Sequence, residues 1–341
     1  MSNVQGYARA LYYPTMNVED EAWLKSALLY WDKIETIVPV NVAMPFVGYT
    51  QEACAAAGVL APLHVSEMPD VLRNLGQALT SANWQDIMTQ ISQRRLYGTS
   101  GDFENTLLHA EKMSGDLQLV LKEMGLLGNE DRNGWFQADP QVANLYMSCL
   151  AEEVAFHISA SSITDKPKEF GFQLAKSLAN DKHRSSLQNV PATLVQLAFR
   201  KLKIDPATPL ERLLRFREDH AEELARFRGA MRALAQSVSD VEPGRLIGPV
   251  LDDIWQTDVE PSVTAIAENL KEGGIATRLE GVVRLIGAIQ SANVAEVIAQ
   301  GHNLFASFTS VRKEKKRANP YSYLVDLRAE FGEPLGRAIS H

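Results

Sequence analysis

Three aspartates stand beside segments that the sequence predicts to be strands. Asp20 follows the first such segment, Asp32 lies between the first predicted helix and the second strand, and Asp165 lies within SITDKP, where a strand should end. If the three carboxylates converge at the carboxyl edge of a parallel sheet, they could hold Mg²⁺ or Mn²⁺, because hard cations take oxygen ligands. The favoured alternative is structural: Asp20 caps a helix, Asp32 ends one, and Asp165 begins a turn before Pro167.

Two groups of polar residues in the second half of the chain are candidates for interactions. Arg217 and His220 interrupt an apolar stripe of a predicted long helix, where they could act as an acid–base pair or a switch; pairing with a buried carboxylate is the favoured alternative. A basic run could contact nucleic acid or an anionic partner, although a solvated helix end is favoured because Glu314 lies within it. The run consists of Arg312, Lys313, Lys315, Lys316 and Arg317.

Common catalytic motifs are absent from the chain. There is no GxGxxG after a strand, no GxxxxGK[ST], no GxSxG, no HExxH and no metal-spaced cluster of Cys and His. The two cysteines, Cys54 and Cys149, lack CxxC spacing and are expected to be small buried residues. We therefore expect no resident cofactor, and Mg²⁺ or Mn²⁺ only if the aspartates converge.

Composition excludes further classes of protein. The 341 residues are 45% apolar and 22% charged, as in ordinary globular proteins, and the net charge of −8 disfavours broad binding to a phosphate backbone. No window reaches the 18 or so apolar residues of a membrane span, and no signal peptide precedes Tyr7. We expect a cytoplasmic protein with no transmembrane segment.

The elements that would position these residues alternate between strand and helix at the N-terminus. YARALYYP and KIETIVPV read as strands around a helix capped by Asn17, which makes a parallel crossover, and GVLAPLHV could add a third strand. Residues 66–127 show helical spacing, and GWFQADP looks like a short strand. SASSITDKP and ATLVQLAFRKLKI are expected to join the first sheet.

These patterns predict an α/β or α+β fold that is mostly helical, with a small, mostly parallel sheet. The expected divisions are an N-terminal βαβ part, a helical insertion, a second αβ part of the sheet and a helical C-terminal portion that begins with one long helix. The corresponding ranges are 1–65, 66–128, 129–205 and 206–341, with the long helix at 209–238.

Several segments, taken together and in order, carry a family resemblance. They are ALYYP, WLKSALLYWDKIETIVP, LYMSCLAEEVAF, ITDKP and PLERLLRFREDHAEELARFRGAM. Over most of its length the chain resembles a bacterial family designated domain of unknown function 6236. The resemblance implies a bacterial cytosolic protein with an accessory role and no activity that can be transferred.

Two classes of function follow from the sequence. The first is a non-enzymatic interaction protein, an accessory component of a multi-protein system, which binds a protein partner or forms a homo-oligomer; nucleic acid is a less favoured partner. It is supported by the missing motifs and by the long helix rich in Arg and Glu. The alternative is a nuclease-like hydrolase that depends on a divalent metal held by Asp20, Asp32 and Asp165.

Overall fold

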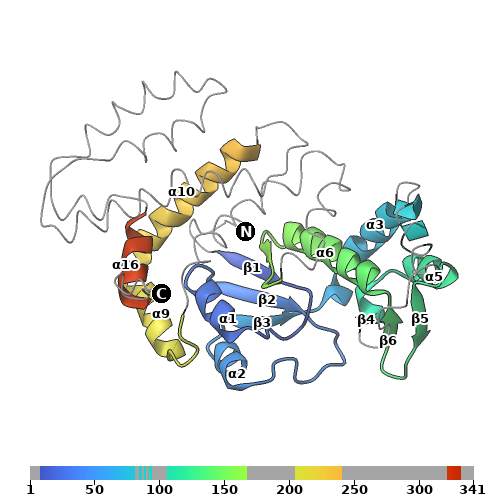
Figure 1. Cartoon of the computed structure of the whole chain (residues 1–341), viewed down its shortest axis with the longest axis horizontal. Helices are drawn as coiled ribbons and strands as arrows, with labels where there is room; N and C mark the ends of the chain where they lie inside the picture. Colours follow the sequence, from blue (N-terminus) through green and yellow to red (C-terminus); the bar gives the residue numbers. More distant parts are fainter. Residues whose placement is uncertain are drawn as a thin grey trace, which may run out of the picture. The chain divides into compact units, whose positions relative to one another are not determined.

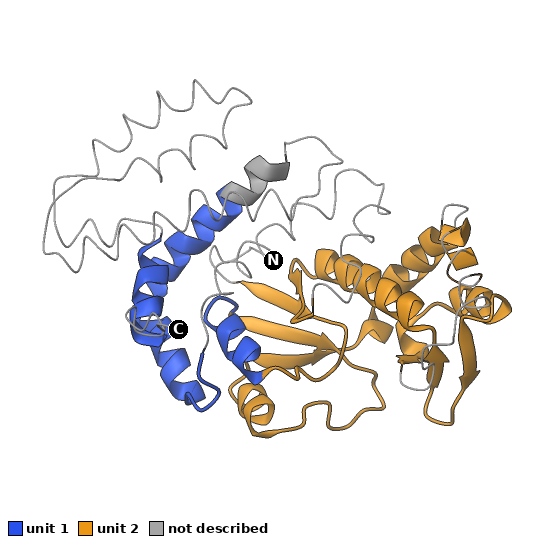
Figure 2. Ribbon diagram, viewed as in Figure 1, with its two compact units in different colours: residues 1–7, 21–31, 186–341 blue, residues 8–20, 32–185 orange. Residues whose placement is uncertain are grey.

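The computed structural model describes residues 8–80, 84–86, 88–89, 91, 93, 106–166, 204–239 and 321–331. The chain forms two compact units (Figure 2). Unit 1 comprises residues 1–7, 21–31 and 186–341, and unit 2 comprises residues 8–20 and 32–185. Among the described residues, no helix is both long enough and apolar enough to cross a membrane.

Unit 2 contains the small parallel sheet that the sequence predicts (Figure 1). Its strands are β1 (Arg9–Tyr12), β2 (Lys33–Ile37), β3 (Leu60–Leu63) and β7 (Ser161–Ile163). They lie in the order β3-β2-β1-β7, and each neighbouring pair is parallel. SASSITDKP therefore joins the first sheet, as expected, whereas nearly all of the expected strand at 192–204 lies outside the described residues.

The predicted mixed α/β fold, with helix in the majority, is confirmed. Around the parallel sheet, unit 2 contains α2 (Tyr49–Ala56), η1 (Val65–Glu67), α3 (Pro69–Leu79), η3 (Ala110–Lys112), α5 (Gly115–Glu123) and α6 (Pro140–His157). In chain order, α2 connects β2 to β3, and α6 leads to β7.

A second sheet occupies part of the segment that the sequence predicts to be only helical. Its strands are β4 (Leu107–His109), β6 (Trp135–Ala138) and β5 (Leu127–Glu130), all antiparallel. The turn between β5 and β6 is held by Asp131, whose Oδ1 accepts hydrogen bonds from the backbone N–H groups of Asn133 and Trp135, each at 2.8 Å. β5 and β6 therefore form a β-hairpin, because this local turn chemistry allows two short strands to pair.

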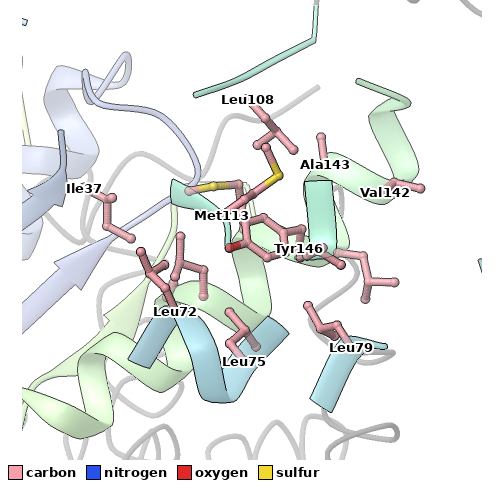
Figure 3. Close-up of a cluster of buried hydrophobic side chains, with 14 of the residues drawn as sticks. Ile37, Leu72, Leu75, Leu79, Leu108, Met113, Val142, Ala143 and Tyr146 are labelled. Atoms are coloured by element: carbon pink, nitrogen blue, oxygen red, sulfur yellow. The ribbon is translucent and has the colours of Figure 1, made fainter. Parts of the chain in front are cut away.

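The core of unit 2 lies between α3, α6 and the strands (Figure 3). The apolar face of α3 contributes Leu72, Leu75 and Leu79, and α6 contributes Val142 and Tyr146. The spacing of these residues at three, four or seven positions places each set on one face of its helix. The apolar residues of the amphipathic α3 are therefore buried in this core.

Unit 1 contains α1 (Glu21–Leu28), α9 (Leu210–Asp219), α10 (Ala221–Ser239) and α16 (Ser322–Phe331). The single helix expected at 209–238 is two helices, α9 and α10. His220 separates them, with φ −115° and ψ 26°. Its Nδ1 lies 2.9 Å from the carbonyl oxygen of Phe216, and its ring stacks on the Phe216 ring with centroids 4.1 Å apart. The φ and ψ angles of His220 are not helical, so the backbone changes direction between α9 and α10 at this residue.

Candidate functional site

Asp32 lies at the amino edge of the parallel sheet. Its backbone N–H donates to the carbonyl oxygen of Ala8 at 2.8 Å, and its Oδ2 accepts from the N–H of Ala8 at 2.7 Å. Ala8 directly precedes β1. The position follows from topology, because a helix that leads into a parallel strand must deliver the chain to the amino end of that strand.

Asp165 lies at the opposite, carboxyl edge, just beyond β7. Its Oδ1 accepts a hydrogen bond from the hydroxyl group of Tyr12, the last residue of β1, at 3.0 Å. The backbones of Ala8 and Tyr12 are four residues apart on one extended segment, which corresponds to about 13 Å. Asp32 and Asp165 therefore belong to opposite edges of the sheet and do not form a single cation site with Asp20.

Asp20 and Asp165 are brought to the same edge. Burial raises the pKa of the Asp165 carboxyl group, and the negative charge of Asp20 adds to the effect, while Tyr12 and Lys166 oppose it. Burial also raises the pKa of Tyr12. Among the residues that the structure describes, no group of three or more His, Cys, Asp or Glu side chains is arranged to hold a metal ion.

The place where Tyr12 meets Asp165 is the topological switch point of the sheet. From β1 the strand order proceeds through β2 to β3 on one side and to β7 on the other. In open parallel sheets, ligands and partners are commonly bound outside the carboxyl ends of the strands at such a point. Among the segments that lead away from this edge are residues 13–20 after β1 and residues 38–48 after β2.

The second of these segments and the first residue of α2 expose an unusual amount of apolar surface. Val40, Met44, Val47 and Tyr49 are 58%, 82%, 65% and 87% exposed. They are four of the seven large hydrophobic residues that are exposed in the described part of the chain, and they fall within ten positions. We call residues 40–49 the apolar segment. Exposed apolar surface that is concentrated in this way is typical of interaction sites.

Side-chain hydrogen bonds fasten the apolar segment to the segment after β1. Gln51 accepts from the N–H of Val18 at 3.2 Å, and its Nε2 donates to the carbonyl oxygens of Val18 and Val47 at 3.0 and 3.2 Å. Asn17 Oδ1 accepts from the N–H of Val47 at 3.3 Å. Asn17, which the sequence predicts to cap the first helix, therefore holds the apolar segment instead.

The other end of the apolar segment is also held. The N–H of Val40 donates to Glu111 Oε2 at 2.8 Å, and Asn41 Nδ2 donates to the carbonyl oxygen of Asn133 at 3.0 Å. The apolar side chains are therefore presented on a backbone with defined anchor points at both ends.

The segment after β1, together with the segment after β2 and the first turn of α2, is acidic. Residues 13–20 and 38–52 together contain Glu19, Asp20 and Glu52 and no Lys or Arg. Glu52 follows Tyr49 by three positions on α2, so the two side chains are neighbours on the helix surface. Lys166 brings a positive charge to the edge and pairs with Glu19 at 2.9 Å. The described carboxyl edge thus combines exposed apolar side chains with an excess of negative charge.

The remaining candidates from the sequence lie elsewhere. His220 has its Nε2 4.0 Å from Asp326 Oδ2 in unit 1, which agrees with the favoured pairing with a carboxylate, and Arg217 is half-buried on α9. The basic run at 312–317 lies outside the described residues.

The apolar segment was missed in the sequence. VPVNVAMPFVGY carries a signal in retrospect, because its apolar residues follow neither a helical nor a strand period although they lie between a strand and a helix. Comparisons with family models, curated proteins and solved structures found no match for the chain. The class of protein is therefore defined by geometry alone: a mixed α/β protein with a small parallel sheet and an apolar, acidic carboxyl edge.

Proposed function

We propose that this chain is a non-enzymatic interaction protein, an accessory component of a multi-protein system in the bacterial cytoplasm, and that it binds a protein partner through its apolar segment. The observation that carries the proposal is the concentration of exposed large hydrophobic residues between Val40 and Tyr49. Burial of such side chains in a partner removes apolar surface from water, which is the main driving force of most protein association.

The arrangement of the apolar segment supports binding over accidental exposure. Gln51 and Asn17 hold one end, and Glu111 and Asn133 accept hydrogen bonds from the other. A segment that is ordered before binding loses less conformational entropy when it docks. The exposed side chains are therefore preorganised for a complementary surface.

The metal-dependent nuclease alternative has less support. Of its three proposed ligands, Asp20 and Asp165 lie at the carboxyl edge, while Asp32 is hydrogen-bonded to Ala8 at the amino edge. Cleavage of nucleic acid in the presence of Mg²⁺ or Mn²⁺ that is lost in Asp165→Ala, but kept in Asp32→Ala, would favour a two-carboxylate site over the interaction proposal.

The test compares three forms of the full chain as bait in extracts of its native cells. The forms are the wild type, Met44→Ser combined with Val47→Ser, and the control Leu119→Ser, which replaces an exposed leucine on α5. We expect the wild type and Leu119→Ser to retain one partner in stoichiometric amount and the double variant to lose it, with unchanged far-UV circular dichroism. Equal capture by all three forms would refute the proposal, as would a monomer with no stoichiometric partner.

A further inference from the structure

We propose that His109 positions the Val40 end of the apolar segment, and that protonation of its ring releases this end and weakens the binding of the partner. The inference rests on the proposed function, to which it adds a positioning residue and a dependence on pH. It follows from a chain of hydrogen bonds that connects the His109 ring to both anchors at that end of the segment.

His109, the last residue of β4, is buried with both ring nitrogens in contact with backbone groups. It is 2% exposed. Its Nε2 lies 2.9 Å from the carbonyl oxygen of Asn133, and its Nδ1 lies 3.2 Å from the backbone nitrogen of Glu111. A carbonyl oxygen only accepts and an N–H only donates, so the neutral ring carries its proton on Nε2. The contacts therefore select one tautomer.

The two hydrogen-bond partners of the ring are also the two anchors of the apolar segment. Oε2 of Glu111 accepts from the N–H of Val40 at 2.8 Å, and the carbonyl oxygen of Asn133 accepts from Nδ2 of Asn41 at 3.0 Å. Glu111 belongs to the short turn η3, which the His109 side chain caps. The imidazole thus holds the backbone from which the Glu111 side chain reaches Val40.

Neighbouring residues keep the ring in this position. β4 lies beside β6 (Figure 1), and His109 pairs there with Trp135. The Trp135 ring meets the imidazole edge to face, with centroids 4.8 Å apart. On the β5–β6 turn, Gly134 leaves room for the imidazole, since a Cβ there would lie 2.9 Å from Nε2. The ring therefore cannot exchange its partners without moving these neighbours.

Protonation changes one of the two ring contacts. At Nε2 the charged ring still donates to the carbonyl oxygen of Asn133. At Nδ1 it becomes a donor that faces another donor, the N–H of Glu111, so the cap of η3 is lost. Imidazole ordinarily titrates at about pH 6.5, whereas the ordinary titration of a glutamate is at about pH 4.3. Mild acid therefore acts on the Val40 anchor through the ring and leaves the Asn41 anchor in place.

The charged groups around the ring give it no compensating ion pair. On the described elements next to it they are Glu111 and Lys112 on η3, Glu130 on β5, and Asp131 and Arg132 in the β5–β6 turn. The printed contacts of the ring are to backbone groups and to Trp135, and no carboxylate of the described residues pairs with it. A positive charge on His109 is thus accompanied by the loss of a hydrogen bond and not by the gain of an ion pair.

A second imidazole near the segment responds differently. Nδ1 of His64 lies 2.9 Å from the carbonyl oxygen of Val38. It donates to this oxygen in the neutral ring and in the charged ring alike, so protonation of His64 keeps the contact.

The test observes the apolar segment without the partner. Hydrogen exchange of peptides that cover residues 38–48 is followed by mass spectrometry in the full chain at about pH 7.5 and about pH 5.5, on either side of the ordinary titration of imidazole. Each rate is divided by the intrinsic rate of the same peptide at that pH. In the wild type we expect the protection of peptides that contain Val40 to fall by about three- to tenfold at the lower pH, as for the loss of one hydrogen bond.

Variants separate the ring from its partners. His109→Asn places a side-chain oxygen that does not titrate at the cap position, so protection should be kept at both pH values. Glu111→Ala removes the anchor itself, so protection should be low and independent of pH, and this variant keeps the test decisive if the substitution of the buried His109 prevents folding. His157→Gln, which replaces an exposed histidine in the last turn of α6, should behave as the wild type.

Partner capture at the same two pH values connects the position of the segment to binding. Capture by the wild type should weaken by a similar factor at the lower pH, and capture by His109→Asn should not, which distinguishes titration of His109 from titration of the partner. Protection or capture that does not change with pH in the wild type would overturn the inference, as would an equal fall in His109→Asn.

The outcomes distinguish this inference from the proposed function. If capture requires Met44 and Val47 but neither capture nor protection responds to pH, the role of His109 is wrong while the interaction function stands. If protection responds as expected but Met44→Ser combined with Val47→Ser captures the same partner as the wild type, the interaction function fails and His109 only positions the segment.

Discussion

Lys112 is the residue whose replacement is expected to change stability most informatively. Its side chain is only 4% exposed, and in the described part of the chain no carboxylate pairs with its ammonium group. Burial lowers its pKa from 10.5 to about 8. The charged form therefore costs the folded state about 3 kcal/mol at pH 7. Methionine has a similar length and no charge, so Lys112→Met should raise the free energy of unfolding by about that amount.

The stability difference between the wild type and Lys112→Met is expected to change with pH. Between about pH 8 and pH 10.5 the unfolded state binds more protons at Lys112 than the folded state does, so the lysine becomes less destabilising as the pH rises. The advantage of Lys112→Met should accordingly be full at pH 7 and clearly smaller at about pH 9.5. Urea unfolding of both proteins at the two pH values measures it. Groups such as Cys149 titrate in both proteins, so their contributions cancel in the difference.

A matched control is Lys122→Met, because Lys122 is exposed on α5 and lies 4.6 Å above the Phe136 ring. This substitution should change the free energy of unfolding by less than about 1 kcal/mol. A Lys112→Met variant that is less stable than the wild type at pH 7, or whose advantage is the same at both pH values, would refute the reasoning.

Three further substitutions test local features of unit 2, each by urea unfolding. Asp139→Ala removes the N-cap of α6 and should cost about 1–2 kcal/mol, whereas Asp139→Asn should retain most of the stability; equal losses would contradict the cap. Gly134→Ala should cost about 1–3 kcal/mol, because φ is +85° and a Cβ would lie 2.9 Å from His109 Nε2; a neutral result would contradict this strain. Glu35→Ala should cost about 2 kcal/mol, since the buried carboxylate pairs with Arg9 at 2.6 Å; no loss would show that the pair contributes nothing net.

Much of the parallel sheet could be predicted because its signals are local. Short apolar runs ended by proline or turn residues mark β1 and β2, and the crossover rule makes these strands parallel. Of the second sheet, only the strand β6 was predicted, and its pairing with β4 and β5 was not. β4 has only three residues, and the adjacent leucines Leu107 and Leu108 are compatible with either helix or strand. Its pairing with β6, more than twenty positions away, decides between them.

The candidate site, like the second sheet, depends on contacts between distant residues that local sequence patterns do not predict. The sequence shows that three aspartates lie near the ends of strands. It does not show at which edge of the sheet each one lies, because that depends on the direction of the strands. Asp32 and Asp165 lie at opposite edges. The exposure of the apolar segment could not be read from composition, because a hydrophobic residue is buried only if another element covers it.

The sequence by itself determined the elements whose signals are periodic or terminated by turn residues: the parallel strands, the amphipathic α3 and the long α6. The tertiary structure alone decided that Tyr12 meets Asp165 at the switch point, that Gln51 joins two loops, and that Val40 to Tyr49 stay exposed. The physical reason is that these features arise between residues far apart in the chain, whose proximity depends on strand order and on hydrogen bonds between loops rather than on any local pattern.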